Sequence, residues 1–550
     1  MNKELANCQT NATQNIVKAG EEYIKNTLLS EVIPDYAAIN HKTKAVHIHD
    51  FEFYGISHNC IGIRVSTLLN NRKMSFSQLL RELGRKIVWL TNQQSGGIGF
   101  LDFDSDMAEY IDAISDEFAI EELREFFFDL NTFSRKGCEK PYVTFNFGLN
   151  TSDKGRRCSK LLLSAYSKGE QNGNPLIFPN LVFKLKKEIN VEENTPNYDL
   201  YQMALSVTSK RMVPTYFNCD AEGNKNADMN KIGIMGCRTR VVSNIYGEES
   251  GLNRGNIACV TINLVQLAFR ANNSIKNLLS LIQEKMEDSK NLLLHRQNYL
   301  VEHGNFSEIK ANRIYKDSDK DNLEMLRNGT LSIGFIGLWD AISVLHSCSF
   351  ESINDMQKYE LEAYNIVEFM RKEVDTYKES TNLNFSLLAS AAEGVSGSFA
   401  EYDKCHLGEN SEVCVKGYYT NSFHVPVYVE CDYIQKIDFE APFHNLCNGG
   451  CITYIEMDEM PGNNVEATYE VIDYAYKAGC NYIGINFPLD NCNSCGFIGR
   501  IAGKCPKCES DNIRRLRRVS GYLAEENRFT MGKKKEMLLR KSHLQNNLNW

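Results

Sequence analysis

Apolar residues recur at helical spacing in four long stretches of the chain. In residues 274–300 they return every three or four positions behind Ser274, a residue type that caps helix N-termini. The same spacing predicts amphipathic helices over residues 76–93, 106–130 and 355–377. Each of these helices would bury one face and leave the other in water.

Short apolar runs of strand-forming residues lie between these stretches. They cover residues 258–267, 424–430, 451–457 and 481–487. Helices that alternate with short strands predict an α/β fold, in which functional residues gather at strand ends and loops.

Composition narrows the class of protein. The chain has 550 residues, 43% of them hydrophobic and 24% charged, and contains no apolar run of membrane-spanning length. Because its N-terminus lacks the apolar core of a signal peptide, we expect a cytoplasmic protein without a membrane partner. The net charge of −9 argues against general nucleic-acid binding. Only residues 513–541 are strongly basic, and they could contact nucleic acid or an acidic protein surface.

Eighteen cysteines without an export signal are expected to be mostly thiols. Two Cys-x-x-Cys pairs near the C-terminus have the spacing of a structural zinc ribbon. They are formed by Cys492 and Cys495, and by Cys505 and Cys508. An iron–sulfur site and a redox dithiol are the alternatives. The shift in composition near Asp490 divides the chain into a body at 1–488, a ribbon at 489–512 and a basic tail at 513–550.

The stretch RVSGYLAEENRFTMGKKKE, residues 518–536, resembles the C-terminal signature of glycyl radical enzymes. Together with the ribbon just before it, it resembles the anaerobic (class III) ribonucleoside-triphosphate reductases. Further segments resemble that family in the same order along the chain. They are residues 47–60, 91–104, 209–220, 235–241, 260–268, 385–394, 418–427 and 448–457.

The resemblance implies a ten-stranded α/β barrel of two parallel five-stranded half-sheets around a finger loop, closed by the zinc ribbon and a glycyl radical loop. Gly521 would store the radical, since a residue without a side chain can flatten freely at its α-carbon. Cys237 would become the thiyl radical that abstracts the ribose 3′-hydrogen. Cys60, on the opposite ribose face, would supply the proton or hydrogen needed as the 2′-hydroxyl leaves as water.

The resemblance also implies a reductant. Asn263 matches the position that orients the ribose hydroxyls in formate-using members, and an amide there cannot act as a base at neutral pH. Asn256 is a rival for this role. Cys447 and Cys451 leave open a thioredoxin-type dithiol system instead of formate.

Two further groups of polar residues invite a binding role. Backbone N–H groups at helix starts attract anions, so we expect the substrate triphosphate at two stretches rich in small residues. The candidate residues are Ser390, Glu393, Thr420, Asn421 and Ser422. His47, His49 and His58 suggest a metal site, but without a third ligand at sensible spacing we interpret them as strand histidines with ordinary partners.

The family also predicts partners. We expect a homodimer, dNTP or ATP effectors at a dimer-interface site, and a separate radical S-adenosylmethionine activase with an iron–sulfur cluster, since this sequence has no Cx3Cx2C motif. Because the family segment HIHD already begins at residue 47, we expect no N-terminal nucleotide-binding cone. The alternatives are a pyruvate formate-lyase-like acyltransferase or lyase, and a zinc-ribbon protein that binds nucleic acid through its basic tail.

Overall fold

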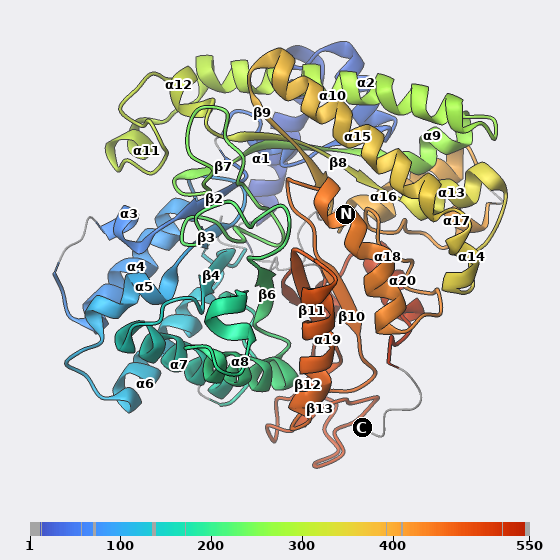
Figure 1. Cartoon of the computed structure of the whole chain (residues 1–550). Helices are drawn as coiled ribbons and strands as arrows, with labels where there is room; N and C mark the ends of the chain where they lie inside the picture. The colour runs from blue at the N-terminus through green and yellow to red at the C-terminus, as the bar shows by residue number, and fades with distance from the viewer. Residues whose placement is uncertain are drawn as a thin grey trace.

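One large mixed sheet forms the centre of the computed structural model (Figure 1). The structure describes residues 12, 14–56, 58–69, 73–134, 139–170, 172–391, 393–408, 411–519 and 521–544. The strand order is β10-β11-β6-β5-β4-β3-β2-β7-β8-β9, and β1 pairs with β7. The strands are β1 Val46–Ile48, β2 Cys60–Ile63, β3 Ile98–Phe100, β4 Val143–Phe147, β5 Asn180–Leu185, β6 Thr215–Asn218, β7 Arg254–Asn263, β8 Thr330–Ile336, β9 Asn384–Ala389, β10 Thr453–Glu456 and β11 Tyr482–Asn486.

The sheet consists of two parallel halves that run in opposite directions. Strands β2 to β6 pair in parallel, as do β7 to β9 and β10 with β11. The halves meet antiparallel where β2 pairs with β7 and where β11 pairs with β6. A parallel bridge between Leu388 and Gly450 links β9 to the segment before β10. The expected ring of ten strands in two five-stranded halves is therefore confirmed.

Helices cover the outside of this sheet (Figure 1). Helices α10 and α15 pack on β7 and β9, whereas α6, α7 and α8 lie beside the other half. The longer helices are α4 Phe76–Thr91, α6 Asp116–Leu130, α7 Asp153–Lys168, α8 Tyr198–Arg211, α10 Ile275–His303, α13 Leu338–His346, α15 Glu360–Thr381, α18 Tyr433–Leu446 and α19 Val465–Lys477. As predicted, Ser274 caps α10, accepting a hydrogen bond from the Asn277 N–H at 3.3 Å. In the described part of the chain, no helix combines the length and the apolar character needed to cross a membrane.

Four predicted elements differ from the structure. The strand predicted over 258–267 ends at Asn263, and the residues after it begin a helix, α9 (Leu264–Arg270). The stretch 106–130 is interrupted before α6, because the Ser115 hydroxyl accepts a hydrogen bond from the Phe118 N–H and starts a new helix. The stretch 355–377 is likewise divided, with α14 (Ile353–Gln357) ending before α15. The predicted strand at 424–430 is wrong, since this stretch is irregular. It contains Pro426, which has no N–H to give to a strand ladder.

The finger loop occupies the inside of the barrel. It comprises residues 219–253, between β6 and β7. The Asn146 side chain holds it on both sides, since its Oδ1 accepts from the Ile234 N–H at 2.8 Å and its Nδ2 donates to the Ile234 carbonyl at 2.9 Å. A methyl group added to Gly99 on β3 would lie 2.6 Å from the Met235 Cα. Glycine in the GGIGF stretch thus lets the loop approach the strand backbone.

A second, four-stranded sheet contains the C-terminal motifs. Its order is β13-β12-β14-β15. Strand β12 (Leu489–Cys492) pairs with β14 (Ile513–Arg518), so the expected ribbon and basic tail share one sheet. The remaining strands are β13 Ile498–Gly499 and β15 Leu523–Glu525.

Candidate active site and metal centre

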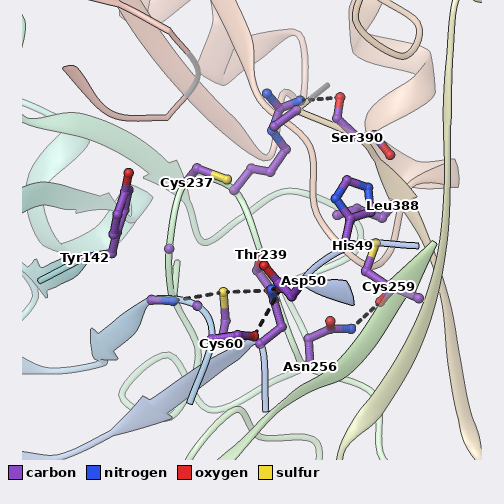
Figure 2. A pocket seen from close by; sticks show the side chains of 18 of the residues that line it. His49, Asp50, Cys60, Tyr142, Cys237, Thr239, Asn256, Cys259, Leu388 and Ser390 are labelled. Carbon is purple, nitrogen blue, oxygen red and sulfur yellow. Dashed lines mark hydrogen bonds between the residues drawn. The ribbon is translucent and has the colours of Figure 1, made fainter. Parts of the chain in front are cut away.

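A cavity of about 140 Å³ lies at the tip of the finger loop (Figure 2). We call it the first cavity. Cys60, Cys237, Ser390 and Glu393, which the sequence singled out, all line it. Its other polar walls come from β7, from the segment after β1 and from the C-terminal segment. They include His49, Asp50, Asn59, Arg238, Thr239, Asn256, Cys259 and Tyr522.

Gly521 lies against the backbone of Cys237. A methyl group added to Gly521 would lie 1.4 Å from the carbonyl oxygen of Cys237 and 2.8 Å from its Cα. The φ of Gly521 lies outside the left-handed region, so it is this close approach that requires glycine. The half-buried Cys237 therefore has the Gly521 backbone on one side and the first cavity on the other.

Cys60 and Asn256 face each other across the antiparallel join between β2 and β7. Burial raises the pKa of the Cys60 thiol to about 12, so it stays protonated at neutral pH. Its sulfur donates to the Asn59 Oδ1 at 3.2 Å and accepts from the Gly97 N–H at 3.3 Å. The Asn256 Nδ2 donates to Ser332 at 2.6 Å, while its buried Oδ1 has no partner among the described residues. The Asn256 Oδ1 is thus a hydrogen-bond acceptor on the strand that pairs with the protonated Cys60 thiol.

Asn263 lies outside the first cavity. Its Oδ1 accepts a hydrogen bond from the Gln266 N–H at 3.2 Å and so caps α9 (Leu264–Arg270). Its Nδ2 donates to the Asp403 carboxylate at 2.8 Å. The structure therefore gives Asn263 a strand-end position and brings its rival Asn256 to the cavity.

The expected triphosphate residues separate into two places. The Ser390 hydroxyl lies 2.6 Å from that of Thr261 in the wall of the first cavity. Glu393 accepts a hydrogen bond from the Tyr522 hydroxyl, which ties this wall to the segment of Gly521. Thr420 and Asn421 line a different, second cavity, and Ser422 is buried and lines neither.

Cys259 and Arg238 also line the first cavity, although neither is among the residues selected from the sequence. Arg238 donates to the carbonyls of Ala389 at 3.0 Å and Ser390 at 3.3 Å, so it anchors the finger loop to the end of β9. For Arg238, the one signal that could have identified it was its position next to Cys237 in the sequence. For Cys259 no signal existed, because a lone cysteine on a strand is more often core.

Cys447 and Cys451 lie in a turn that contacts the finger loop, and neither lines the first cavity. Both are buried, and burial raises the pKa of the Cys451 thiol to about 12. The N–H of Arg240 donates to the Gly449 carbonyl at 3.0 Å, which packs this turn against the loop. A buried, protonated thiol pair is poorly suited to exchange with an external disulfide protein.

His47, His49 and His58 each pack against a neighbouring ring, but the buried Nδ1 of His58 has no partner among the described residues, unlike the ordinary partners expected for it. His49 bonds to the Thr261 hydroxyl at 2.7 Å, and its ring lies 4.8 Å from that of His47. The His58 ring packs on Tyr315 at 3.8 Å. Among the described residues, no cluster with metal-ligand geometry includes a histidine.

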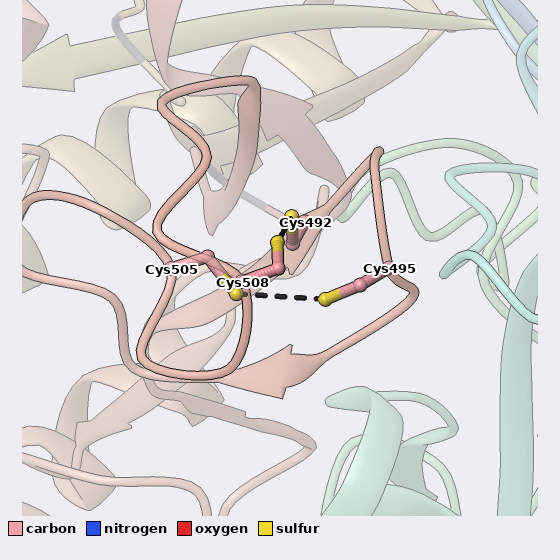
Figure 3. A group of neighbouring side chains, drawn as sticks. All are labelled: Cys492, Cys495, Cys505 and Cys508. Atoms are coloured by element: carbon pink, nitrogen blue, oxygen red, sulfur yellow. Dashed lines mark hydrogen bonds between the residues drawn. The ribbon is translucent and has the colours of Figure 1, made fainter.

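The four cysteines of the ribbon point toward one another (Figure 3). Their sulfur atoms all lie within 4.8 Å of one another. The sulfurs of Cys492 and Cys508, and those of Cys495 and Cys505, are each 3.6 Å apart. Tetrahedral zinc with Zn–S bonds of about 2.3 Å separates its sulfurs by roughly 3.8 Å. The donor set therefore fits a closed structural Zn²⁺ site with no position for substrate.

Ion pairs within the chain engage much of the basic C-terminal segment. Arg514 pairs with Glu525 at 3.0 Å, and Arg517 pairs with Asp490 at 2.5 Å. Further along, Arg540 lies 3.6 Å from Glu456 of the barrel. The first two pairs join strands of the C-terminal sheet, and Arg540 holds the segment on the barrel.

Comparisons with known proteins agree with this geometry. A family model described as "Anaerobic ribonucleoside-triphosphate reductase" matches residues 4–543. The anaerobic ribonucleoside-triphosphate reductase of Escherichia coli is 33% identical over 445 residues, which cover 76% of this chain and 61% of that relative. The protein of the same name from Enterobacteria phage T4 is 26% identical, with 98% of each chain covered. The chain thus spans about 61% of the length of the bacterial relative.

Solved structures show the same fold. One described as "Anaerobic ribonucleotide reductase" superposes with a TM-score of 0.78 at 16% identity, covering 98% of this chain and 88% of that one. The Thermotoga maritima anaerobic ribonucleotide reductase in complex with dATP and CTP gives 0.74 at 16% identity, covering 96% and 92%. At this identity the likeness concerns the fold alone.

Proposed function

Because the chain belongs to the anaerobic ribonucleoside-triphosphate reductase family, we propose that it reduces ribonucleoside triphosphates to 2′-deoxyribonucleoside triphosphates by glycyl and thiyl radical chemistry, for DNA precursor synthesis. The observation that supports this most is the contact of Gly521 with Cys237, whose other side faces the first cavity. This backbone contact supports a direct transfer of a hydrogen atom between the two residues, without a further relay.

In the proposed reaction, Gly521 in its radical form takes the hydrogen atom of the Cys237 thiol. The Cys237 sulfur then takes the ribose 3′-hydrogen, and the 2′-hydroxyl leaves as water after protonation. Cys60 suits the role of donor, since its raised pKa keeps the thiol protonated. At the end the 3′-hydrogen returns from Cys237, and the cysteine regains its hydrogen from Gly521.

Formate is the proposed reductant. Overall, one ribonucleotide, one formate and one proton give one deoxyribonucleotide, one carbon dioxide and one water, so the two electrons come from formate. We assign Asn256 rather than Asn263 to the ribose hydroxyls, because Asn256 lines the cavity and its Oδ1 has no partner among the described residues, whereas Asn263 does not line the cavity. The burial of Cys447 and Cys451 supports formate over an external dithiol protein.

The proposal includes partners. A separate radical S-adenosylmethionine activase would install the radical on Gly521. By analogy with the dATP-bound Thermotoga maritima protein, a homodimer would bind dNTP or ATP effectors. Zn²⁺ on the four cysteines would hold β12 and β14 together, and with them the segment that leads to Gly521.

The deciding experiment is anaerobic activation with an activase, S-adenosylmethionine and a reductant, followed by EPR spectroscopy and a turnover assay. We expect a glycine-type doublet and conversion of a ribonucleoside triphosphate with formate as the sole electron source. A doublet that persists in Gly521→Ala would refute the radical site. Turnover that requires a redoxin would refute formate. A radical without nucleotide reduction would favour another glycyl radical activity, such as an acyltransferase or lyase.

A further inference from the structure

A second cavity, of about 40 Å³, lies beneath the segment that carries Gly521. It shares no lining residue with the first cavity. Its walls come from residues 418–427, from α18 and β10, from the end of β14, and from helix α20 (Met531–Leu539) and the residues after it. In liquid water each molecule occupies about 30 Å³. The second cavity therefore has room for a few heavy atoms but not for a nucleotide.

Several residues that line this second cavity carry a buried polar atom without a partner among the described residues. These atoms are the Tyr418 hydroxyl, the Thr420 hydroxyl, the His424 Nε2, the Arg518 Nη1 and the Arg540 Nε. Tyr418, Thr420, His424 and Arg518 are each more than nine-tenths buried. Buried donors and acceptors rarely remain unpaired, because each one lost its hydrogen bonds to water on folding. Unpaired atoms from separate elements around one cavity therefore indicate a ligand.

Arg518 stands out among these residues. Its Nε donates to the Ile485 carbonyl at 3.0 Å and its Nη2 to the Met212 carbonyl, so neutral oxygens take two of its three nitrogens. The third nitrogen, Nη1, has no partner among the described residues, and Arg518 lines the cavity. The Glu456 carboxylate, which lines the same cavity, favours the charged form of Arg518 but also pairs with Arg540 at 3.6 Å. A buried arginine whose hydrogen bonds go to neutral oxygens would be stabilised by a further negative charge.

The charges around the cavity do not balance. The lining side chains and their ion-pair partners comprise the cations Lys436, Arg518, Lys533 and Arg540 and the carboxylates Glu440, Glu456 and Glu536. Burial lowers the pKa of His424 and of His543, which keeps both rings neutral. Among the residues that line the cavity itself, three are cations and two are carboxylates, an excess of one positive charge.

We propose that the second cavity binds one small monovalent oxyanion, of the size of formate or bicarbonate. Its oxygens would accept hydrogen bonds from the Arg518 Nη1 and from the hydroxyls of Tyr418 and Thr420. Nδ1 of His424 lies 3.1 Å from Glu440, so Nε2 of the neutral ring is an acceptor. Bicarbonate, unlike formate, carries a hydroxyl that can donate to it.

The anion would join the barrel to the C-terminal segment. Tyr418 and Thr420 belong to the barrel, whereas Arg518 lies three residues before Gly521. Arg540 donates to the Arg518 carbonyl at 3.2 Å, so the two arginines move together. Loss of the anion would leave the Arg518 charge uncompensated and weaken the docking of Gly521 against Cys237. The inference does not depend on the proposed reaction, because docking is a property of the chain before any radical forms.

The test uses the unactivated full-length chain. Its Tm and its rate of trypsin cleavage within 513–541 are measured with formate, with bicarbonate and with chloride at equal ionic strength. We expect a saturable Tm increase of about 1–2 °C and slower cleavage with at least one oxyanion, and neither effect with chloride. A larger Tm increase and slower cleavage with bicarbonate than with formate would identify bicarbonate, which carries the additional hydroxyl, as the preferred ligand.

The variants Thr420→Val and Tyr418→Phe each remove one unpaired hydroxyl. Both should lose the oxyanion effect, while their Tm without oxyanion should equal or exceed that of the wild type. Thr468→Val is the matched control, because the Thr468 hydroxyl on α19 is also buried without a partner but lines neither cavity. It should keep the oxyanion effect. An effect that persists in Thr420→Val and Tyr418→Phe, or no effect in the wild type, would overturn the proposal, since the second cavity would then hold only water.

Discussion

The contact between Gly521 and Cys237 can be tested without generating a radical. In Gly521→Ala the new methyl group would lie 1.4 Å from the Cys237 carbonyl oxygen, whereas ordinary contacts begin at 3.4 Å. The segment must therefore retreat by about 2 Å or push the finger loop away. Overpacking of a well-packed site costs about 1–3 kcal/mol, which would weaken docking of the segment against the barrel.

The assay is amide hydrogen exchange at the backbone N–H groups of Arg518 and Val519. In the docked segment the Arg518 N–H donates to Asn486 at 3.0 Å, and the Val519 N–H donates to the Tyr522 carbonyl at 3.2 Å. A docking loss of 1–3 kcal/mol predicts exchange that is about 5- to 150-fold faster at these amides, if they exchange by local opening. After activation, the variant should also show no glycine-type EPR doublet.

Gly503→Ala in the ribbon is the control, because a methyl group added there meets no atom within 4 Å. It should leave exchange at both amides unchanged. Equal protection in Gly521→Ala and the wild type would refute the close approach, even if the EPR doublet disappeared. Faster exchange in the control as well would show that the assay reports ribbon stability and not docking.

Three further predictions concern the cavity, the metal centre and a buried carboxyl group. Asn256→Ala should lower kcat/KM about 10- to 100-fold, because a hydrogen bond to the substrate is lost. Asn263→Ala should instead lower the free energy of unfolding by about 1–3 kcal/mol, because the helix cap is lost, and should keep its turnover per folded molecule. The reverse pattern in kinetics and denaturation would assign the ribose hydroxyls to Asn263. Cys505→Ser should release the zinc, so elemental analysis should find less than one Zn²⁺ per chain. Trypsin cleavage within residues 513–541 should become roughly tenfold faster. An unchanged metal content would exclude the four cysteines as the zinc site. Burial raises the pKa of Asp104 from the usual 3.8 to about 7, so between these values the folded state holds a proton that the unfolded state has lost. Stability should therefore fall as pH rises through this window, by up to about 1.4 kcal/mol per pH unit, and Asp104→Asn should flatten the slope in denaturant titrations.

Much of the fold followed from local patterns. Helix α10 began at its Ser274 cap, and the four ribbon cysteines came together as their spacing predicted. Local signals failed where a cap or a proline interrupted an apolar pattern. Ser115 divided the helix expected over 106–130, and Pro426 kept the predicted strand at 424–430 out of the sheet.

Selecting Asn256 over Asn263 needed the tertiary structure. Simple alternation along β7 places residues three apart on opposite faces. An irregularity in the register between Asn256 and Ala258 changes that alternation, so Asn256 and Cys259 both line the first cavity. Asn263 lies at the end of the same strand, where its side chain caps a helix instead.

The sequence by itself determined the chemistry that short spacings encode: a four-thiolate metal site, a glycine in a radical-type motif and the thiols that could serve it. Such groups depend on neighbours within a few residues, whose geometry the chain fixes locally. Only the tertiary structure decided that Gly521 touches Cys237 across 284 positions of sequence, that Thr420 lines a second cavity, and that one nitrogen of the buried Arg518 has no partner among the described residues. These facts depend on how the barrel, the finger loop and the C-terminal sheet pack together, and no local pattern encodes that packing.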